Sequence, residues 1–351
     1  YFVRALNVTS VDSLLTVDTL AYSSGTSSTA FRVSGVRGEE IGFVRLAAGK
    51  GLALRSLRTR SWGVTVTTNN DTTKTSRSTL PWQDQLAHSV SFPIKIDSLN
   101  LGGGAVEVHL PKASLFDSRG LDLSAIKFDF DTGAAANQPG FAHALAIAAS
   151  DVRYNATSSA AEVKNFSGTI QDSLITVGTA IYYPSGIRKG KSPMEVSDLR
   201  IDGISFDSLV SGSAILANSL SARAWKISGL PSGSSSKKSK KTSNSIWAAQ
   251  QEAAKSIGMA IRIGRIDLAG GSVRVASPTI VADGASINAV GFDLDSSNAA
   301  SKKLFFSKDI GVKASRFQFA DKKKLDVVNL RSAHTSLSSR SVFASSAEYL
   351  S

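Results

Sequence analysis

Few residues of this chain have the types and the spacing that catalysis or metal binding requires. Two acidic pairs, Asp129 with Asp131 and Asp293 with Asp295, are each separated by one residue. Carboxylates at positions i and i+2 of a strand face the same side, as a divalent cation or a glycosidase mechanism would need. Both pairs alternate with apolar residues and occur in the same sequence setting, which favours the water-exposed face of a sheet over a metal or catalytic site.

Other catalytic and nucleotide-binding patterns are incomplete. The stretch GIRKGKS, Gly186–Ser192, has three residues between its glycines, whereas a phosphate-binding P-loop has four. The four histidines, at positions 88, 109, 143 and 334, lack the short spacing of shared metal ligands. Cysteine is absent, and no G-x-S-x-G motif occurs. We therefore predict no enzymatic activity, no cofactor and no bound metal.

Composition and charge exclude some classes of protein. The 351 residues are 42% hydrophobic and 19% charged, which is typical of a folded chain with a sizeable core. A net charge of +12 would suit an anionic partner, but many lysines fall in two runs, Lys237–Lys241 and Lys322–Lys324, that read as solvated loops. We expect no nucleic-acid partner. No apolar run is long enough to span a membrane, so we expect any membrane anchor to lie in a part of the protein outside this segment.

The elements that carry these residues are repeated along the chain. VDSLLTV, Val11–Val17, reappears as QDSLITV, Gln171–Val177. SLRTRSW, Ser56–Trp62, reappears as SLSARAW, Ser219–Trp225, and the acidic pairs follow in the same order. Landmarks that recur in order at a nearly constant spacing indicate an internal repeat.

The third landmark is IKIDSLNLGGGAVEV, Ile94–Val108, which returns as IRIGRIDLAGGSVRV, Ile261–Val275. Apolar residues alternate with polar ones, the period of a sheet with one apolar face. Ser98 shifts the phase by one residue, and Gly102–Gly104 can form a turn or a bulge. The residues predicted to share the apolar face are Ile94, Ile96, Leu99, Leu101, Val106, Val108, Ile261, Ile263, Ile266, Leu268, Val273 and Val275.

The repeat predicts three sections. Residues 1–140 form a first β repeat, 141–300 a second, and 301–351 the start of a third, truncated one. Within the second, 231–243 is predicted to be a loop and 245–257 an amphipathic helix, because Ile246, Ala249, Ala253 and Ile257 share one helical face.

These landmarks carry a family resemblance. A short helix entering I-x-I-x-x-L-x-L-x-G-G-x-V-x-V, then strands closing on alternating Phe and Asp, then SKDIGVKASRFQF, Ser307–Phe319, resembles the AsmA-like proteins of bacterial envelopes, which are related to TamB. The resemblance covers most of the chain. It implies an elongated, strongly twisted β-sheet forming a groove, located in the periplasm, that passes phospholipids between membranes or assists outer-membrane assembly. Inner- or outer-membrane proteins would be further partners.

Two functional hypotheses follow. The fold prediction is a mainly β chain: a twisted antiparallel sheet of repeated units that forms a groove (β-taco-like), with one or two short helices. In the first hypothesis the groove is non-enzymatic and binds the acyl chains of phospholipid along the twelve aliphatic residues named above. The alternative is a structural or adaptor subunit of a larger envelope complex, without lipid transport. A carbohydrate-active β-domain would need an aromatic platform beside paired carboxylates, which the repetition disfavours.

Overall fold

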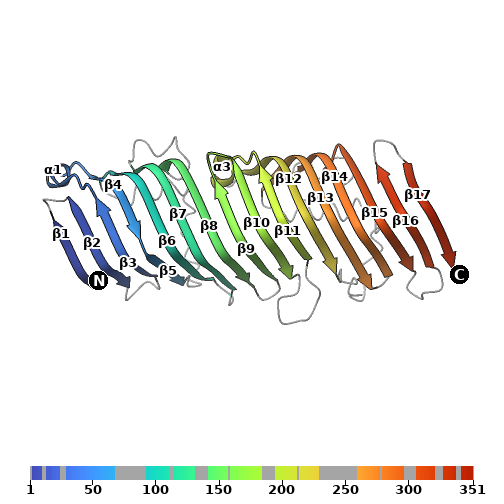
Figure 1. The fold of residues 1–351 in the computed structure, drawn as a ribbon, viewed down its shortest axis with the longest axis horizontal. Coiled ribbons are helices and arrows are strands. Elements are labelled where there is room, and N and C mark those ends of the chain that lie inside the picture. Colours follow the sequence, from blue (N-terminus) through green and yellow to red (C-terminus); the bar gives the residue numbers. More distant parts are fainter. Residues whose placement is uncertain are drawn as a thin grey trace, which may run out of the picture. The chain divides into compact units, whose positions relative to one another are not determined.

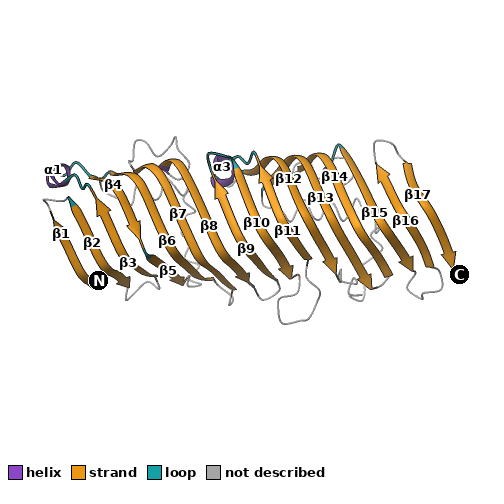
Figure 2. Ribbon diagram, in the orientation of Figure 1, coloured by secondary structure: helices purple, strands orange, loops and turns teal. Residues whose placement is uncertain are grey.

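The chain is mainly β. The computed structural model describes residues 2–9, 13–23, 29–67, 92–110, 114–130, 141–156, 159–183, 194–211, 213–228, 259–276, 279–295, 306–320, 327–336 and 341–350. Within them, the strands belong to one mixed, mostly antiparallel sheet of 17 strands, accompanied by two short helices (Figures 1 and 2). The prediction of a mainly β chain with one or two short helices is confirmed.

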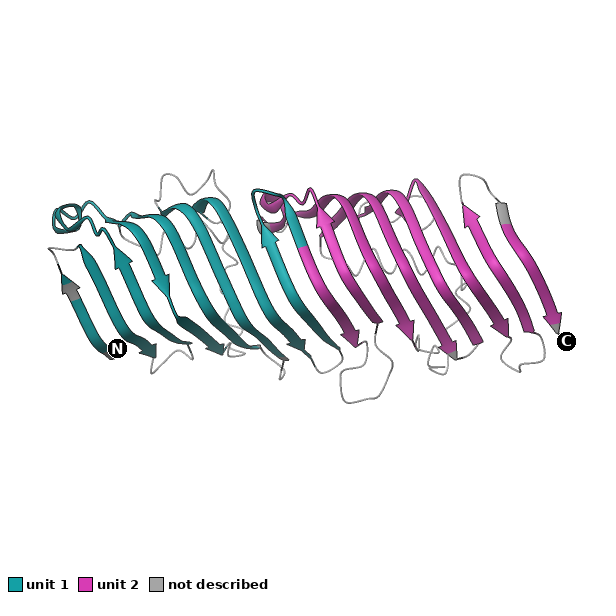
Figure 3. Cartoon of the chain, in the orientation of Figure 1, with its two compact units in different colours: residues 1–175 teal, residues 176–351 magenta. Residues whose placement is uncertain are grey.

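The chain divides into two compact units, residues Tyr1–Ile175 and Thr176–Ser351 (Figure 3). Their boundary falls inside strand β10 (Leu174–Tyr183). The predicted sections 1–140, 141–300 and 301–351 describe repeats in the sequence and not compact units. They remain predictions.

Unit 1 is built from antiparallel neighbours with one parallel joint. Its elements are β1 (Phe2–Thr9), β2 (Leu14–Ser23), β3 (Thr29–Glu39), α1 (Phe43–Ala47), β4 (Leu52–Thr59), β5 (Ser61–Thr67), β6 (Ile94–Leu110), β7 (Ser114–Phe130), β8 (Ala142–Asn155) and β9 (Ala160–Thr169). Strands β4 and β5 follow one another along β3, antiparallel to it. Both pair with β6 in parallel.

Unit 2 begins within β10, contains most of that strand, and then repeats the order of elements seen in unit 1. Its elements are β11 (Met194–Asp202), α3 (Phe206–Val210), β12 (Ala214–Ser228), β13 (Ala260–Ala276), β14 (Thr279–Leu294), β15 (Asp309–Ala320), β16 (Val327–Ser336) and β17 (Ser341–Leu350). Strands β12 and β13 are parallel, whereas the pairs β11–β12 and β13–β14 through β16–β17 are antiparallel.

The sheet is mostly antiparallel, as predicted, and each unit adds one place where neighbouring strands run parallel. Parallel neighbours need a crossover connection of a dozen or more residues. Both joints fall where a long connection precedes the glycine-containing strand, at 68–91 before β6 and at 229–258 before β13. These connections lie outside the described residues, as do the predicted loop 231–243 and helix 245–257.

Each glycine-containing landmark lies within one continuous strand of 17 residues. The ladder between β6 and β7 shifts register between Leu101 and Gly104, and that between β13 and β14 shifts between Leu268 and Gly271. Inside these shifts Gly103 has φ +59° and Gly270 has φ +58°. Of the two sequence-based alternatives, the bulge is confirmed and the turn is wrong.

The strands that pair with β6 and β13 also contain glycines with a positive φ, which interrupt the regular ladder. Gly120 of β7 and Gly284 of β14 both have φ +58°. Opposite them, Ser150 Oγ and Ser315 Oγ donate hydrogen bonds, of 3.0 and 2.8 Å, to the carbonyl of the residue before each glycine. These bonds satisfy acceptors that the interrupted ladder leaves unpaired. The long strands of each unit curve (Figure 3), which is compatible with the predicted groove.

Candidate functional site

The predicted apolar residues of β6 share one face of unit 1. Ile96 and Leu99 are buried in a single cluster, although Ser98 lies between them. The predicted change of phase is therefore confirmed. Half-buried Ile94 and Leu101 pack against the same cluster. The other residues of the cluster and its half-buried neighbours come from β2, β4, β7 and β8 and from the segment around α1: Leu15, Ile41, Phe43, Leu52, Leu54, Leu57, Leu123, Ala125, Phe128, Ala142 and Leu145.

Beyond the bulge, Val106 and Val108 are half-buried. They pair in parallel with Val64 and Val66 of β5. Valine side chains at paired positions stand on the same face of a sheet. These four residues form an aliphatic strip across β5 and the second half of β6.

The corresponding residues of unit 2 are divided between two clusters. Ile261 packs against buried Leu294 and Phe306. Leu268 and Val273 pack against a cluster that contains buried Trp225. Of the remaining predicted residues, Ile263 is buried, and Ile266 and Val275 are half-buried.

The apolar faces are only partly covered. Of the twelve predicted residues, the buried ones are Ile96, Leu99 and Ile263, with exposed fractions of 4%, 7% and 7%, and the rest are half-buried. In the described part of the chain, no large side chain is completely buried. A sheet with an apolar face normally packs against a second layer, but the only helices among the described residues are five residues long.

The opposite face is exposed to solvent and carries several ion pairs. Arg200 and Arg265 each bond to the aspartate two residues further along the strand, Asp202 at 2.6 Å and Asp267 at 2.5 Å. The hydrogen bonds from Arg200 hold the pKa of Asp202 below its usual value and raise the pKa of Arg200. The hydrogen bonds to Asp267 raise the pKa of Arg265 in the same way.

One of the two acidic pairs can be placed completely. Asp293 lies in β14 and Asp295 directly follows its end, and each is 3.2 Å from the guanidinium of Arg262, which places both on the same side. Lys95 forms the matching ion pair with Asp129 at 2.8 Å, whereas Asp131 lies outside the described residues. Where the chain is described, no group of three or more metal-ligating side chains occurs. The predicted arrangement of carboxylates on one side of a strand is confirmed for Asp293 and Asp295.

Two other sequence features cannot be placed. The basic stretch Gly186–Ser192 and the histidine at position 88 lie outside the described residues. His109 forms a contact of 2.8 Å with Glu107 on the same strand, as a surface residue would.

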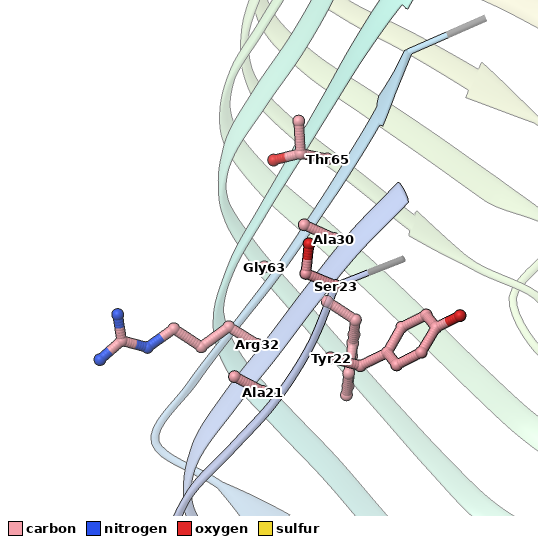
Figure 4. Close-up of a pocket in the computed structure, with 8 residues that line it drawn as sticks. Ala21, Tyr22, Ser23, Ala30, Arg32, Gly63 and Thr65 are labelled. Carbon is pink, nitrogen blue, oxygen red and sulfur yellow. The ribbon is translucent and has the colours of Figure 1, made fainter. Parts of the chain in front are cut away.

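Unit 1 contains a hollow near the ends of β2, β3 and β5 (Figure 4). The alternating pattern of the strands does not predict it. It has a volume of about 450 Å³, within the range of small-molecule sites. It is lined by Ala21, Tyr22, Ser23, Ala30, Phe31, Arg32, Gly63 and Thr65. Tyr22 and Arg32 point to opposite sides (Figure 4). Gly63 lies opposite Arg32 across the ladder, so the small residue leaves space beside a long one. That pairing is the only sequence signal for the hollow.

The fold and the faces define a mainly β, curved-sheet protein with one charged and one partly covered apolar face in each unit. None of the helices in the described ranges has the length and apolar character needed to cross a membrane. Comparisons of the sequence with models of known protein families and with curated proteins find no match.

Proposed function

We propose that the apolar faces of the two units bind the acyl chains of phospholipids, and that the protein conducts lipid between membranes or assists outer-membrane assembly in the periplasm of a bacterial envelope. The resemblance to AsmA-like proteins supports the compartment and the role. The role is non-enzymatic and uses no cofactor.

The observation that carries the proposal is the incomplete burial of the aliphatic face in each unit. Nine of the twelve predicted residues keep part of their surface accessible, beside strands of 17 residues. An acyl chain laid on this face would gain about 0.8 kcal/mol for each methylene group removed from water. The charged opposite face offers no comparable gain.

The adaptor hypothesis uses the same faces differently. A partner protein could cover the aliphatic residues, and purified protein would then contain no lipid. The two hypotheses differ in what occupies the face in the isolated chain, so lipid content separates them.

The test is native mass spectrometry with lipid extraction on the purified 351-residue chain. We expect co-purified phospholipid in the unmodified protein. The variants Ile96→Asp and Ile263→Asp place a charge on each apolar face, and lipid content should fall by about tenfold or more because a carboxylate is costly beside acyl chains. Since both sites are buried, Leu101→Asp and Ile266→Asp at half-buried positions repeat the test with less risk to folding.

Matched controls lie on the other face of the sheet, one in each unit. Ile126 and Val290 are 53% and 52% exposed, and Ile126→Asp and Val290→Asp should leave the lipid content unchanged. Circular dichroism melting checks that each variant is folded. A folded, lipid-free unmodified protein would favour the adaptor role, and equal lipid in folded variants of both faces would refute the assignment of the site.

A further inference from the structure

Helix α1 exposes apolar and basic side chains together at one end of unit 1. Val44 is 87% exposed and Leu46 is 43% exposed. Arg45 lies between them, and Lys50 follows in the turn that leads to β4; both are exposed. Single exposed apolar residues are ordinary on protein surfaces. Here they flank a basic residue on a helix of five residues, none of which is buried.

The equivalent helix of unit 2 shows that the fold does not require this surface. Helix α1 reads FVRLA and helix α3 reads FDSLV. Asp207 and Ser208 of α3 therefore stand at the positions of Val44 and Arg45. Ser205 caps α3 by accepting a hydrogen bond from the Ser208 amide, whereas α1 has no side-chain cap. Unit 2 builds the same element with polar side chains.

The positive charge at α1 is not compensated by nearby carboxylates. The guanidinium of Arg45 donates to the Lys50 carbonyl at 3.1 Å. Within the described ranges, neither Arg45 nor Lys50 forms an ion pair with a carboxylate. The carboxylate of Glu40, which precedes the helix, is bound by Arg55. The turn after α1 therefore presents a net positive charge beside exposed apolar groups.

This surface continues into the apolar face of unit 1. Phe43, the first residue of α1, packs against the cluster that contains Ile96 and Leu99. Phe92, which is 43% exposed, lies at the same end of the sheet, because the next residue accepts a hydrogen bond of 2.8 Å from the Leu52 amide. An apolar path therefore joins the exposed helix to the proposed acyl-chain site.

We infer that α1 and its following turn dock onto the surface of a membrane that contains anionic lipid. Val44, the most exposed apolar residue of the helix, enters the interface, and Arg45 and Lys50 lie among the headgroups. Apolar side chains flanked by basic ones bind anionic bilayers through buried apolar area and electrostatic attraction. The inference rests on the proposed function in one respect: docking places the end of the apolar face beside a source of phospholipid.

Vesicle flotation of the full chain tests this docking. We expect binding to vesicles of phosphatidylcholine and phosphatidylglycerol at about four to one, weaker binding to phosphatidylcholine alone, and release in about 0.5 M NaCl. The double variant Val44→Asp with Arg45→Ser gives α1 the residues of α3. Its vesicle-bound fraction should fall by about tenfold. An aspartate in the first turn of a helix is favourable, so the variant should fold.

The matched control is Ile126→Asp, which removes another exposed apolar side chain of unit 1 and should float as the unmodified protein does. Failure of this inference is distinguishable from failure of the proposed function, because co-purified lipid is measured separately. The α1 variant should keep its lipid, and Leu101→Asp should lose lipid but still bind vesicles. The inference is overturned if the unmodified chain stays with the protein-only fraction, as a protein-docking helix would, or if the α1 variant binds equally well.

Discussion

Replacing Gly270 by alanine should lower the free energy of unfolding of unit 2 by about 3 kcal/mol. Gly270 has φ +58°, and an added Cβ would lie 2.6 Å from the backbone oxygen of Arg223 in the neighbouring parallel strand. The left-handed conformation alone costs a residue with a side chain about 1–2 kcal/mol. The contact adds to this cost, because a ladder carbonyl cannot move without disturbing its own hydrogen bonds.

The comparison variant is Gly311→Ala in the same unit. Gly311 has no left-handed φ, and its added Cβ would lie 3.8 Å from the Thr335 oxygen, an ordinary contact. Its free energy of unfolding should stay within about 0.5 kcal/mol of the unmodified value. Urea titration followed by tryptophan fluorescence measures both variants, since Trp225 lies against the residue after Gly270. Equal midpoints for the two variants would mean that the bulge in β13 does not restrict its side chains.

The sequence predicts the faces of this fold well because a strand has only two faces. In β6, alternation assigns Ile94 and Ile96 to one side, and the extra residue at Ser98 returns Leu99 to the same side. The bulge at Gly103 lies where the glycine run predicts an interruption. A period of two and a glycine run are local signals, so no knowledge of the neighbouring strands is needed to read them.

Some elements cannot be predicted from the sequence, because they are too short or depend on residues far away in the chain. Helices α1 and α3 have five residues each, too few to show a helical period. The parallel joint at β12–β13 depends on how a long connection returns to the sheet. Lys127 adopts φ +51° within β7, although nothing in its residue type favours that conformation.

For the candidate site, too, some features can be predicted from the sequence and others cannot. The aliphatic residues of the apolar face are found from their period. The ion pairs of Arg200 with Asp202 and of Arg265 with Asp267 on the opposite face were not predicted, although each pair has the i and i+2 spacing of residues on one side of a strand. How much of the apolar face remains accessible could not be predicted, because it depends on whether a second layer covers the sheet. The exposure of Val44 could not be predicted either, because α1 is too short to show a helical pattern in the sequence.

At position 141, a glycine variant should be more stable than an alanine variant, the reverse of the usual order within a strand. Phe141 has φ +59° and is 4% exposed, with its ring 4.7 Å from that of Phe130. Phe306, in unit 2, has the same φ and is 8% exposed. A bulky residue keeps a left-handed conformation only when its surroundings enforce it. The cost of that conformation must therefore be smaller than the stabilisation from packing the ring.

Phe141→Ala should lower the free energy of unfolding of unit 1 by about 3–4 kcal/mol, because it leaves a cavity and keeps the unfavourable φ. Phe141→Gly removes the same ring but relieves the conformation, so it should be more stable than the alanine variant by about 0.5–1 kcal/mol. At the next position, Ala142 is buried within β8 and has no left-handed φ, and Ala142→Gly should cost about 1 kcal/mol in the ordinary direction. Urea unfolding of the three variants decides the matter. If Phe141→Ala is the more stable of the two Phe141 variants, the backbone at position 141 does not keep its left-handed conformation once the ring is removed.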